Sequence, residues 1–313
     1  MVFPYIWGVT SVKIIYLWQL VKLARMPIVF AVIPIFLIGV LFALRTDAEF
    51  SLLNFLWGFS ILFIIEIAAS FANDYFDYEA DKHNKQIGFS GGSGVLLEYP
   101  ELLPFAKWAS VCMFLLALLL TGFFIIISSL PFWVLGYIGV AVFFCWFYTA
   151  PPLRFVYHGL GEIPHMLAGV MFPGWGYLIL TGTISLELFV FSIPFGLLGL
   201  TVILNFEIPD MEADINGGKR NLIVRKGRYF SFTAIMILYL AAVIFFLVLS
   251  YTAWLNIPIN LWAISLIACI PLFISIVPVL KKIVQPKLAT KFAIRNAIAG
   301  FLAVIIITCI LLA

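Results

Sequence analysis

Charged side chains are scarce in this 313-residue sequence. Only 11% of the residues are charged, whereas 64% are hydrophobic, and the mean hydropathy is +1.15. Soluble domains have about 25% charged residues, so the composition excludes a soluble globular protein as well as a disordered chain. It predicts that most of the chain is buried in a lipid bilayer.

Cysteine is also rare, and the four cysteines show no paired spacing. A disulfide framework or a zinc site needs cysteines at short, regular intervals, so neither is expected. Each cysteine lies in an apolar run, where we expect it to be a small buried apolar residue. They are Cys112, Cys145, Cys269 and Cys309.

Long apolar runs recur along the whole chain. About 20 apolar residues in a helix cross the ~30 Å hydrocarbon core of a bilayer. By this criterion the sequence predicts an all-α polytopic membrane protein, with about nine transmembrane helices around a central cavity and a single domain over residues 1–313. The predicted spans lie near 27–44, 52–72, 105–128, 132–149, 164–182, 187–206, 230–250, 259–279 and 292–312.

The segment 1–26 precedes the first predicted span and does not resemble a cleavable signal peptide. Lys13, Lys22 and Arg25 interrupt its apolar residues, and no small-residue cleavage site follows an apolar run. Residues 12–24 alternate between apolar and basic side chains, which predicts a helix lying in the membrane interface.

Basic residues gather in alternate connections. Of the 18 lysines and arginines, only Arg45 lies outside the N-terminal segment and the connections that follow the second, fourth, sixth and eighth spans. Basic loops stay on the cytoplasmic side, so we expect the N-terminus and these connections inside and the C-terminus outside. The net charge of +3 then reflects topology and anionic lipids or substrates, and indicates no nucleic-acid partner.

Carboxylates are concentrated in two short segments, at 71–84 and 205–221. Each segment follows an even-numbered span, so both emerge on the same side of the membrane. More than half of the 15 acidic residues lie there, namely Asp74, Asp77, Glu79, Asp81, Glu207, Asp210, Glu212 and Asp214.

The spacing within the two segments is helical. Asn73, Asp77 and Asp81 are four residues apart and share one helix face. Asp210 and Asp214 repeat this spacing, and Glu207 lies one turn earlier. Clustered carboxylates repel one another unless a cation neutralises them, and hard oxygen ligands suit Mg²⁺, which also binds substrate phosphates. The pattern predicts a Mg²⁺-bound diphosphate; solvated loop charges are the alternative.

Further polar residues flank these segments. Gly217 and Gly218 form a flexible turn before Lys219 and Arg220, two cations able to hold the remaining phosphate charge. Glu66 lies inside the second span, on the same helix face as Asn73. A carboxylate at that depth is costly unless it faces a polar cavity; a protonated or locally hydrogen-bonded glutamate is the alternative.

Two motifs resemble a known family. NDYFDYEAD at 73–81 resembles the Asn-Asp-x-x-Asp-x-x-x-Asp motif of the UbiA superfamily of intramembrane prenyltransferases, and DMEAD at 210–214 resembles its second motif. The resemblance extends over nearly the whole chain. SGGSGVL at 90–96, YTAPPLRFVYHGLGE at 148–162 and GGKRN at 217–221 resemble the branch of the 1,4-dihydroxy-2-naphthoate prenyltransferases of menaquinone synthesis.

The resemblance implies roles for individual residues. Asp77 and Asp210 would be catalytic, and Asp74 would support the substrate site. Tyr148 would lie near the reacting end of the prenyl chain. The metal ligands implied are Asn73, Asp77, Asp81, Asp210 and Asp214.

The connection after Tyr148 departs from the family pattern. Members often carry a lysine there, whereas this chain has Arg154, which serves a phosphate equally well. His158 and Glu162, four residues apart, would position the acceptor together with His165; polar residues facing the lipid headgroups are the alternative.

The implied reaction is a Mg²⁺-dependent transfer of a prenyl group from a polyprenyl diphosphate to a small hydroxylated aromatic acceptor, such as 1,4-dihydroxy-2-naphthoate, through an allylic carbocation in the bilayer. A glycerol-phosphate ether lipid precursor is the alternative acceptor. A secondary transporter is the rival class, but its sites usually lie near the membrane midplane, whereas these acids gather at one face. A membrane protein that kept the fold and lost the chemistry is a further alternative, against which the intact aspartates argue.

Overall fold

The computed structural model describes residues 16–84, 91–252, 254–255 and 257–313. All elements with assigned bounds in these ranges are helices, which confirms the all-α class. Lys13, Lys85 and Ser90, together with the start of the 12–24 segment, lie outside the described residues. The described part of that segment, from Tyr16, is helical.

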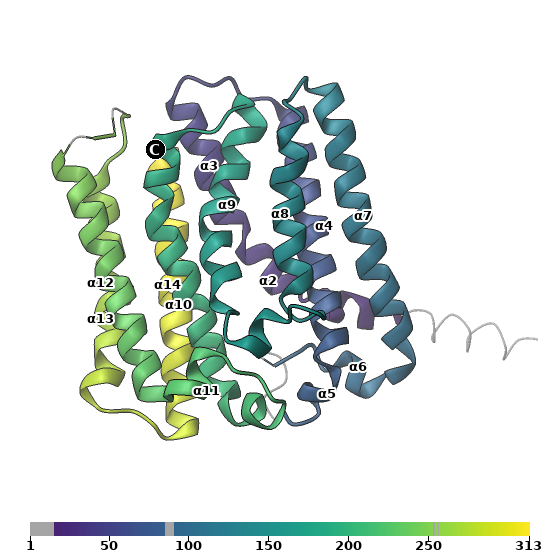
Figure 1. Cartoon of the computed structure of the whole chain (residues 1–313). Helices are drawn as coiled ribbons and strands as arrows, with labels where there is room; N and C mark the ends of the chain where they lie inside the picture. The colour runs from purple at the N-terminus through teal and green to yellow at the C-terminus, as the bar shows by residue number, and fades with distance from the viewer. Residues whose placement is uncertain (1–15, 85–90, 253, 256) are drawn as a thin grey trace, which may run out of the picture.

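Within the described ranges, nine longer helices run up and down the molecule (Figure 1). They are α3 (Ile33–Arg45), α4 (Leu52–Phe76), α7 (Leu103–Ile127), α8 (Trp133–Phe147), α9 (Glu162–Thr181), α10 (Leu186–Asn216), α12 (Arg228–Thr252), α13 (Leu261–Leu280) and α14 (Pro286–Leu312). The short helices are α2 (Met26–Ala31), α5 (Tyr78–Asp81), α6 (Val95–Glu98) and α11 (Leu222–Lys226), with 3₁₀ turns at Pro100–Leu102 and Phe155–His158.

The expected count of nine spans is not confirmed. Among the described residues, seven helices are long and apolar enough to cross a membrane, or eight if the pair Tyr16–Ala31 and Ile33–Arg45, bent by 40°, forms one span. Pro34 lies at this bend and lacks the N–H that would continue the helix. The helix α8 is apolar but only 15 residues long. Even so, each predicted span coincides with one of these helices.

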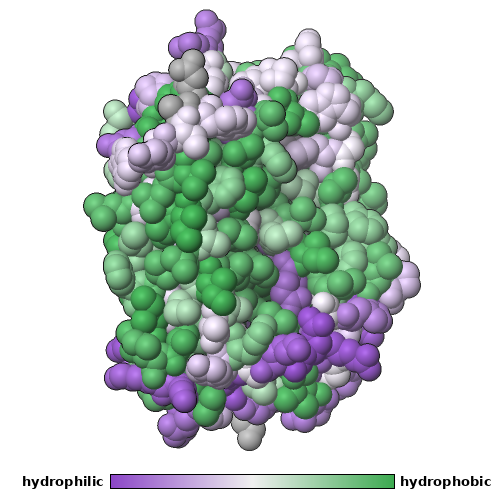
Figure 2. Space-filling model, turned by 60° about the vertical axis from the view of Figure 1, so that its left-hand side comes forward, coloured by the Kyte–Doolittle hydropathy of each residue, from purple (hydrophilic) through white to green (hydrophobic). Residues whose placement is uncertain are grey.

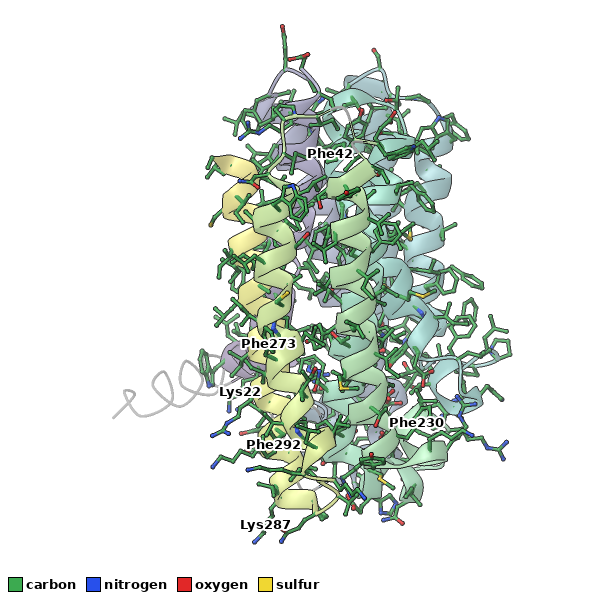
Figure 3. All side chains as sticks on the ribbon, turned by 90° about the vertical axis from the view of Figure 1, so that its left-hand side faces the viewer. Lys22, Phe42, Phe230, Phe273, Lys287 and Phe292 are labelled. Atoms are coloured by element: carbon green, nitrogen blue, oxygen red, sulfur yellow. The ribbon has the colours of Figure 1, made fainter. Side chains whose placement is uncertain are left out.

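The apolar core has two main parts, joined by α3. One lies among α10, α12, α13 and α14, and the other among α4, α7, α8 and α9. Ile38 and Phe42 of α3 belong to the first part, and Phe36 and Val40 belong to the second. In Figure 3 Phe42 lies among the helices in the upper half of the bundle, where its ring is 5.3 Å from that of Phe191.

Glycines let α9 pack closely against α10 and α3. A Cβ on Gly169 would lie 2.1 Å from the carbonyl oxygen of Phe195 in α10, and one on Gly39 of α3 would lie 1.7 Å from that of Pro173. Both approaches are possible only without a side chain, as in many membrane helix pairs. The contact fixes α10, which carries the second acidic segment, beside α9.

The two ends of the bundle differ in polarity. A green apolar belt crosses the face of the molecule seen in Figure 2, with hydrophilic side chains concentrated below it. Lys22 and Lys287 lie at this lower end (Figure 3), and α14 ends at the opposite one (Figure 1). Arg45, the exception to the basic pattern, lies far from the basic end and donates to the carbonyl oxygen of Leu311 at 3.1 Å.

The expected burial of the cysteines is wrong. All four lie within long helices, but Cys112 and Cys309 are exposed, and Cys145 and Cys269 are only partly buried. A helix in a lipid bilayer is apolar all round. An apolar run therefore does not distinguish the side chains that pack inside the protein from those that face lipid.

Candidate active site

The first acidic motif spans the end of α4 and the short helix α5. Asp77 caps α4 with φ −91° and ψ 2°, so the helix is interrupted there. The hydrogen bonds from Asp77 N to Asn73 O (2.9 Å) and from Asp81 N to Asp77 O (2.8 Å) nevertheless continue across the break. The expected spacing is thus largely kept, and the motif extends from the apolar belt into the lower polar end.

The second motif ends against the first. Gly217 follows α10, and a Cβ on it would lie 2.6 Å from the Cβ of Ala80 in α5. Any larger residue would push the two segments apart. The expectation that both acidic segments emerge at the same end is confirmed, since α5 and the end of α10 both lie at the lower end of Figure 1.

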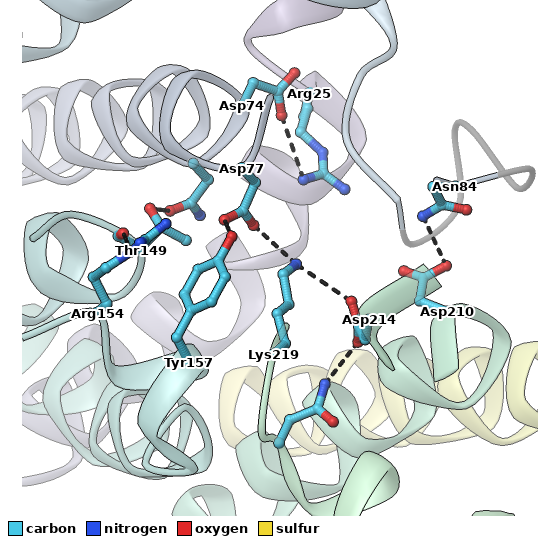
Figure 4. A network of polar contacts seen from close by, with 12 residues as sticks. Arg25, Asp74, Asp77, Asn84, Thr149, Arg154, Tyr157, Asp210, Asp214 and Lys219 are labelled. Atoms are coloured by element: carbon cyan, nitrogen blue, oxygen red, sulfur yellow. Dashed lines mark hydrogen bonds and ion pairs between the residues drawn. The ribbon is translucent and has the colours of Figure 1, made fainter. Parts of the chain in front are cut away.

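A lysine joins the two motifs. The Lys219 Nζ atom lies 2.9 Å from Asp77 Oδ2 and 3.4 Å from Asp214 Oδ1 (Figure 4). Burial by itself lowers the pKa of Lys219, but the carboxylates of Asp77 and Asp214 outweigh it and hold this pKa well above its ordinary value. The ammonium group therefore stays charged between one aspartate of each motif.

The connection after α8 packs against the first motif. The Tyr157 hydroxyl donates to Asp77 Oδ1 at 2.8 Å, and burial, then the charge of Asp77, raises the pKa of Tyr157. The Arg154 guanidinium lies 4.1 Å from the centre of the Tyr157 ring. Thr149 donates to the Asn73 side-chain oxygen at 3.0 Å. Arg154 thus contacts Tyr157, and Tyr157 in turn bonds to Asp77.

Asparagine side chains hold the second motif. Asn84 Nδ2 donates to Asp210 Oδ1 at 3.1 Å, and Asn221 Nδ2 donates to Asp214 Oδ2 at 2.7 Å. Asn84 follows the first motif in sequence, so it forms a second connection between the motifs. Asn221 also caps α11 by accepting from Val224 N at 3.1 Å.

A glycine-containing loop covers the first motif from the other side. Ser93 N donates to Asp74 Oδ2 at 2.9 Å, and the Arg25 guanidinium is 4.0 Å from Asp74 Oδ1. A Cβ on Gly92 would lie 2.2 Å from Asp81 Oδ2. The backbone of this loop can approach the two aspartates so closely only because Gly92 lacks a side chain.

The burial of Asp81 among other carboxylates changes its pKa. Burial, followed by the charge of Asp77, raises the pKa of Asp81 to about 8. A neutral Asp81 is thus favoured at neutral pH until a further cation enters the site.

Further aromatic and acidic candidate residues lie on α4, on α9 and at the end of α8. The Tyr148 ring at the end of α8 meets the His165 ring of α9 edge to face, with centroids 5.2 Å apart. Glu162 Oε1 accepts from Leu222 N at 2.6 Å and so joins α9 to α11. Glu66 is partly buried in α4 and interacts electrostatically with Cys145 of α8.

Some candidate residues lie outside this network. The side chains of Arg220 and His158 are exposed, and neither residue is part of the network in Figure 4. Arg220 N instead donates to the Val156 carbonyl at 3.2 Å. Glu212 faces away and pairs with Arg228, with Nη1 to Oε1 at 2.7 Å.

The sequence analysis missed the partners of the aspartates. Tyr157 and Asn221 lie inside segments that resemble the family, but only the three-dimensional structure shows which carboxylate each one meets. The only hint in the sequence was that these two polar residues lie within segments that resemble the family.

The donor chemistry fits a divalent cation. Among the described residues, no group of three or more His, Cys, Asp or Glu side chains is arranged to hold a metal ion. However, one aspartate from each motif is already directed at the same positive charge, that of Lys219. This ammonium group is a stand-in cation, and the carboxylate oxygens around it are the ligands that Mg²⁺ prefers.

Comparisons with known proteins agree with this arrangement. The model of the UbiA prenyltransferase family matches residues 31–296. The 1,4-dihydroxy-2-naphthoate octaprenyltransferase of Bacillus subtilis (strain 168) is 27% identical to this chain; the match covers 67% of this chain and 66% of the relative, just under two thirds of its length.

Solved structures share the fold. A UbiA homolog from Archaeoglobus fulgidus, bound to DMAPP and Mg²⁺, has a TM-score of 0.64 at 17% identity and covers 92% of this chain and 99% of its own. A structure of digeranylgeranylglyceryl phosphate synthase has a TM-score of 0.63 at 21% identity, and the match covers 93% of this chain and 98% of that one.

Proposed function

The chain belongs to the UbiA prenyltransferase family, and on that premise we propose that it transfers a prenyl group from a polyprenyl diphosphate to a small hydroxylated aromatic acceptor within the membrane. The observation that carries this proposal is the meeting of Asp77 and Asp214, from separate halves of the chain, at one positive charge. A diphosphate with its metal ions needs such a position between two sets of carboxylates.

We assign the metal ligands to the two motifs. The residues that would hold Mg²⁺ are Asn73, Asp77, Asp81, Asp210 and Asp214. Bound there, Mg²⁺ would act as a Lewis acid toward the charge that develops on the leaving diphosphate. Asp74, which bonds to Ser93 and lies beside Arg25, would hold the covering loop and the N-terminal segment in place.

Cations of the chain would complete diphosphate binding. Lys219 is held between the motifs, and its ammonium group would be free to bind a phosphate oxygen once Asp77 and Asp214 held Mg²⁺. Arg154 is held against Tyr157 and is the second candidate. Arg220 is exposed and would reach the diphosphate only from the solvent side.

Tyr148 and its surroundings would protect the reacting carbon. An allylic cation is captured by water unless its site is dry. The Tyr148 ring lies against His165, and its face can stabilise a cation. Glu66, deeper in α4, together with Glu162 at the start of α9 and His158 in the 3₁₀ turn before it, would line the approach of the acceptor.

A dihydroxynaphthoate is the acceptor class we favour, because the Bacillus relative is named for that substrate. This would place the protein in menaquinone biosynthesis. We also propose that residues 1–313 form one domain and that the acidic motifs and the N-terminus face the cytoplasm. The C-terminus would then lie outside.

The test is an assay with protein purified in detergent, Mg²⁺ and labelled geranylgeranyl diphosphate. Three acceptors are compared: 1,4-dihydroxy-2-naphthoate, 4-hydroxybenzoate and geranylgeranylglyceryl phosphate. We expect a prenylated product from the naphthoate together with diphosphate release. A product only from the glyceryl phosphate would replace the aromatic acceptor by an ether-lipid precursor.

A second measurement separates the enzyme from a transporter. The same protein is reconstituted into liposomes and assayed for ion flux. Flux without any prenylated product or diphosphate release would overturn the enzymatic proposal.

A further inference from the structure

Glu207 is a buried carboxyl group without a partner. It is 5% exposed, and neither of its oxygens has a hydrogen-bond partner. Among the described residues, Glu207 is the one carboxyl group of which both oxygens are buried and lack a hydrogen-bond partner. Buried polar groups nearly always have a partner, since an unpaired one costs free energy of folding. A residue of this kind indicates a ligand.

The position of Glu207 differs from that of the metal-binding aspartates. It lies on α10 three residues before Asp210, and so on nearly the same helix face. Because α10 runs from the upper end to the lower polar end, Glu207 is about 4.5 Å farther into the apolar belt, at ~1.5 Å per residue. It is therefore above the diphosphate position and nearer to the membrane interior.

The neighbours of Glu207 identify what it faces. Tyr148, at the end of α8, interacts with it electrostatically, as do Glu162 of α9, Lys219 and both aspartates of the second motif. Tyr148 contacts His165. Glu207 thus lies close to Tyr148, where under the proposed function the first carbon of a prenyl chain would lie when its diphosphate is held by the aspartates.

From this placement we infer that Glu207 binds the hydroxyl group of the acceptor and receives its proton; the inference rests on the proposed function. The hydroxyl donates to a carboxylate oxygen that has no other donor. Hydrogen bonds to a carboxylate are strong, and more so in a dry site. Glu207 would hold the acceptor ring beside the reacting carbon and make it electron-rich.

The proton and electron changes balance. The hydroxyl proton passes to Glu207, and the ring carbon beside the resulting phenoxide forms a bond to the first prenyl carbon. The C–O bond to the diphosphate breaks, and its electron pair leaves with the diphosphate. The ring then loses the substituent at the attacked carbon, either as a proton, which the released diphosphate accepts, or, from a carboxylate, as CO₂. Glu207 returns its proton to the oxygen.

The competing explanation is that Glu207 is a third metal ligand on α10. Three measurements on Glu207→Gln distinguish a metal ligand from an acceptor-binding residue. They are Mg²⁺ binding by calorimetry without substrates, the KM of the prenyl diphosphate, and acceptor binding followed by acceptor fluorescence without prenyl diphosphate. Glu79→Gln is the matched control, since Glu79 is an exposed acid of the first motif paired with Lys82. We expect only acceptor binding to weaken, and only in Glu207→Gln.

Turnover gives a further readout. General base catalysis contributes about 10²- to 10⁴-fold, so kcat/KM for the acceptor should fall at least about a hundredfold in Glu207→Gln. A fluorinated acceptor whose hydroxyl is already ionised at the assay pH should recover most of this loss. A merely structural glutamate would show no such recovery.

The outcomes separate the two proposals. Weaker Mg²⁺ binding, or wild-type acceptor kinetics in Glu207→Gln, overturns the inference while leaving the prenyltransferase intact. The failure of the wild-type protein itself to release diphosphate with any acceptor overturns the proposed function.

Discussion

The Lys219 ammonium lies 2.9 Å from Asp77 Oδ2, although the two residues come from opposite halves of the chain. Lys219 follows the second acidic motif and Asp77 belongs to the first. Their pairing holds the motifs together through a charge that the chain itself supplies. A metal ion that binds the same carboxylates must compete with this ammonium group.

Removing a proposed metal ligand should stop the reaction without unfolding the protein. Asp77→Asn and Asp210→Asn should each lower kcat by at least about a hundredfold, as loss of one stabilising group at a reacting centre commonly does. Product formation and the melting temperature are measured together. Glu79→Gln, in the same motif but exposed, should retain full turnover. Near-wild-type turnover of Asp77→Asn would show that our metal assignment is wrong.

Lys219→Met should destabilise the metal-free protein. Asp77 and Asp214 are each 7% exposed, and loss of their common cation leaves two buried like charges. Breaking a buried ion pair costs about 3 kcal/mol or more, so the free energy of unfolding in EDTA should fall by roughly that amount. Chemical unfolding followed by circular dichroism measures it, and excess Mg²⁺ should restore part of the loss.

Lys82→Met provides the control for that experiment. Lys82 is also paired with an acid, Glu79, but both side chains are exposed, and such pairs contribute little to stability. Its unfolding should match the wild type. If Lys219→Met behaves in EDTA as Lys82→Met does, the bridge between the motifs has no stabilising role.

The metal-free protein should lose stability as the pH rises. The pKa of Asp81 is about 8 in the folded protein against an ordinary 3.8, so between these values the folded state binds more protons than the unfolded state. The free energy of unfolding therefore decreases from about pH 4 to about pH 8. Melting temperatures in EDTA across this range test the slope.

Added Mg²⁺ should reverse this trend. Mg²⁺ needs ionised carboxylates, so its affinity should increase up to about pH 8, with proton release on binding. Calorimetric titrations in buffers of different ionisation enthalpy count the released protons. A Mg²⁺ affinity that does not change with pH would exclude Asp81 from the metal site.

Gly92→Ala should displace the covering loop. The new Cβ would lie 2.2 Å from Asp81 Oδ2, so either the loop or the carboxylate must move. Misplacement of a positioned group by about 1 Å can reduce turnover by up to a hundredfold, and we expect a loss of at least about tenfold. Gly136→Ala is the control, since a Cβ there meets nothing within 4 Å and should leave turnover unchanged.

The proposed orientation can be tested by cysteine labelling. Glu79 lies in the first motif at the lower end, and the exposed Thr183 follows α9 in the turn before α10. On intact cells, an impermeant thiol reagent should label Thr183→Cys but reach Glu79→Cys only after permeabilisation. The reverse pattern would place the acidic motifs outside. The unsubstituted protein gives the background from its four native cysteines.

The sequence was sufficient to predict the helices and the common location of the acidic motifs. Apolar length identifies a span regardless of its partners, and the parity of spans then places Asp77 and Asp214 at one end. The break at Asp77 and the bend before α3 were not predicted, because they depend on tertiary packing and on a proline near a helix start. Only the bend lowers the number of uninterrupted spans, since α4 crosses the membrane before it ends at Phe76.

The contacts of the site could not be read from the sequence. Lys219 was expected to meet a phosphate, yet in the structure it meets aspartates, because without a ligand the nearest countercharges are the carboxylates. Tyr157 has no feature in the sequence that indicates its bond to Asp77. Such pairings join segments far apart in the chain, and periodicity within one helix does not report them.

The bridge between Lys219 and Asp77 also has a consequence for biosynthesis. The ribosome completes α4 and α5 long before it reaches Lys219, so the first half of the protein must wait in the membrane with Asp77 lacking its countercharge. Asp77 lies just beyond the end of α4, at the polar end of the bundle, where water and lipid headgroups can accommodate it meanwhile. Arrival of α10 then replaces these temporary partners, and the proposed metal site is assembled only when the second half of the chain docks.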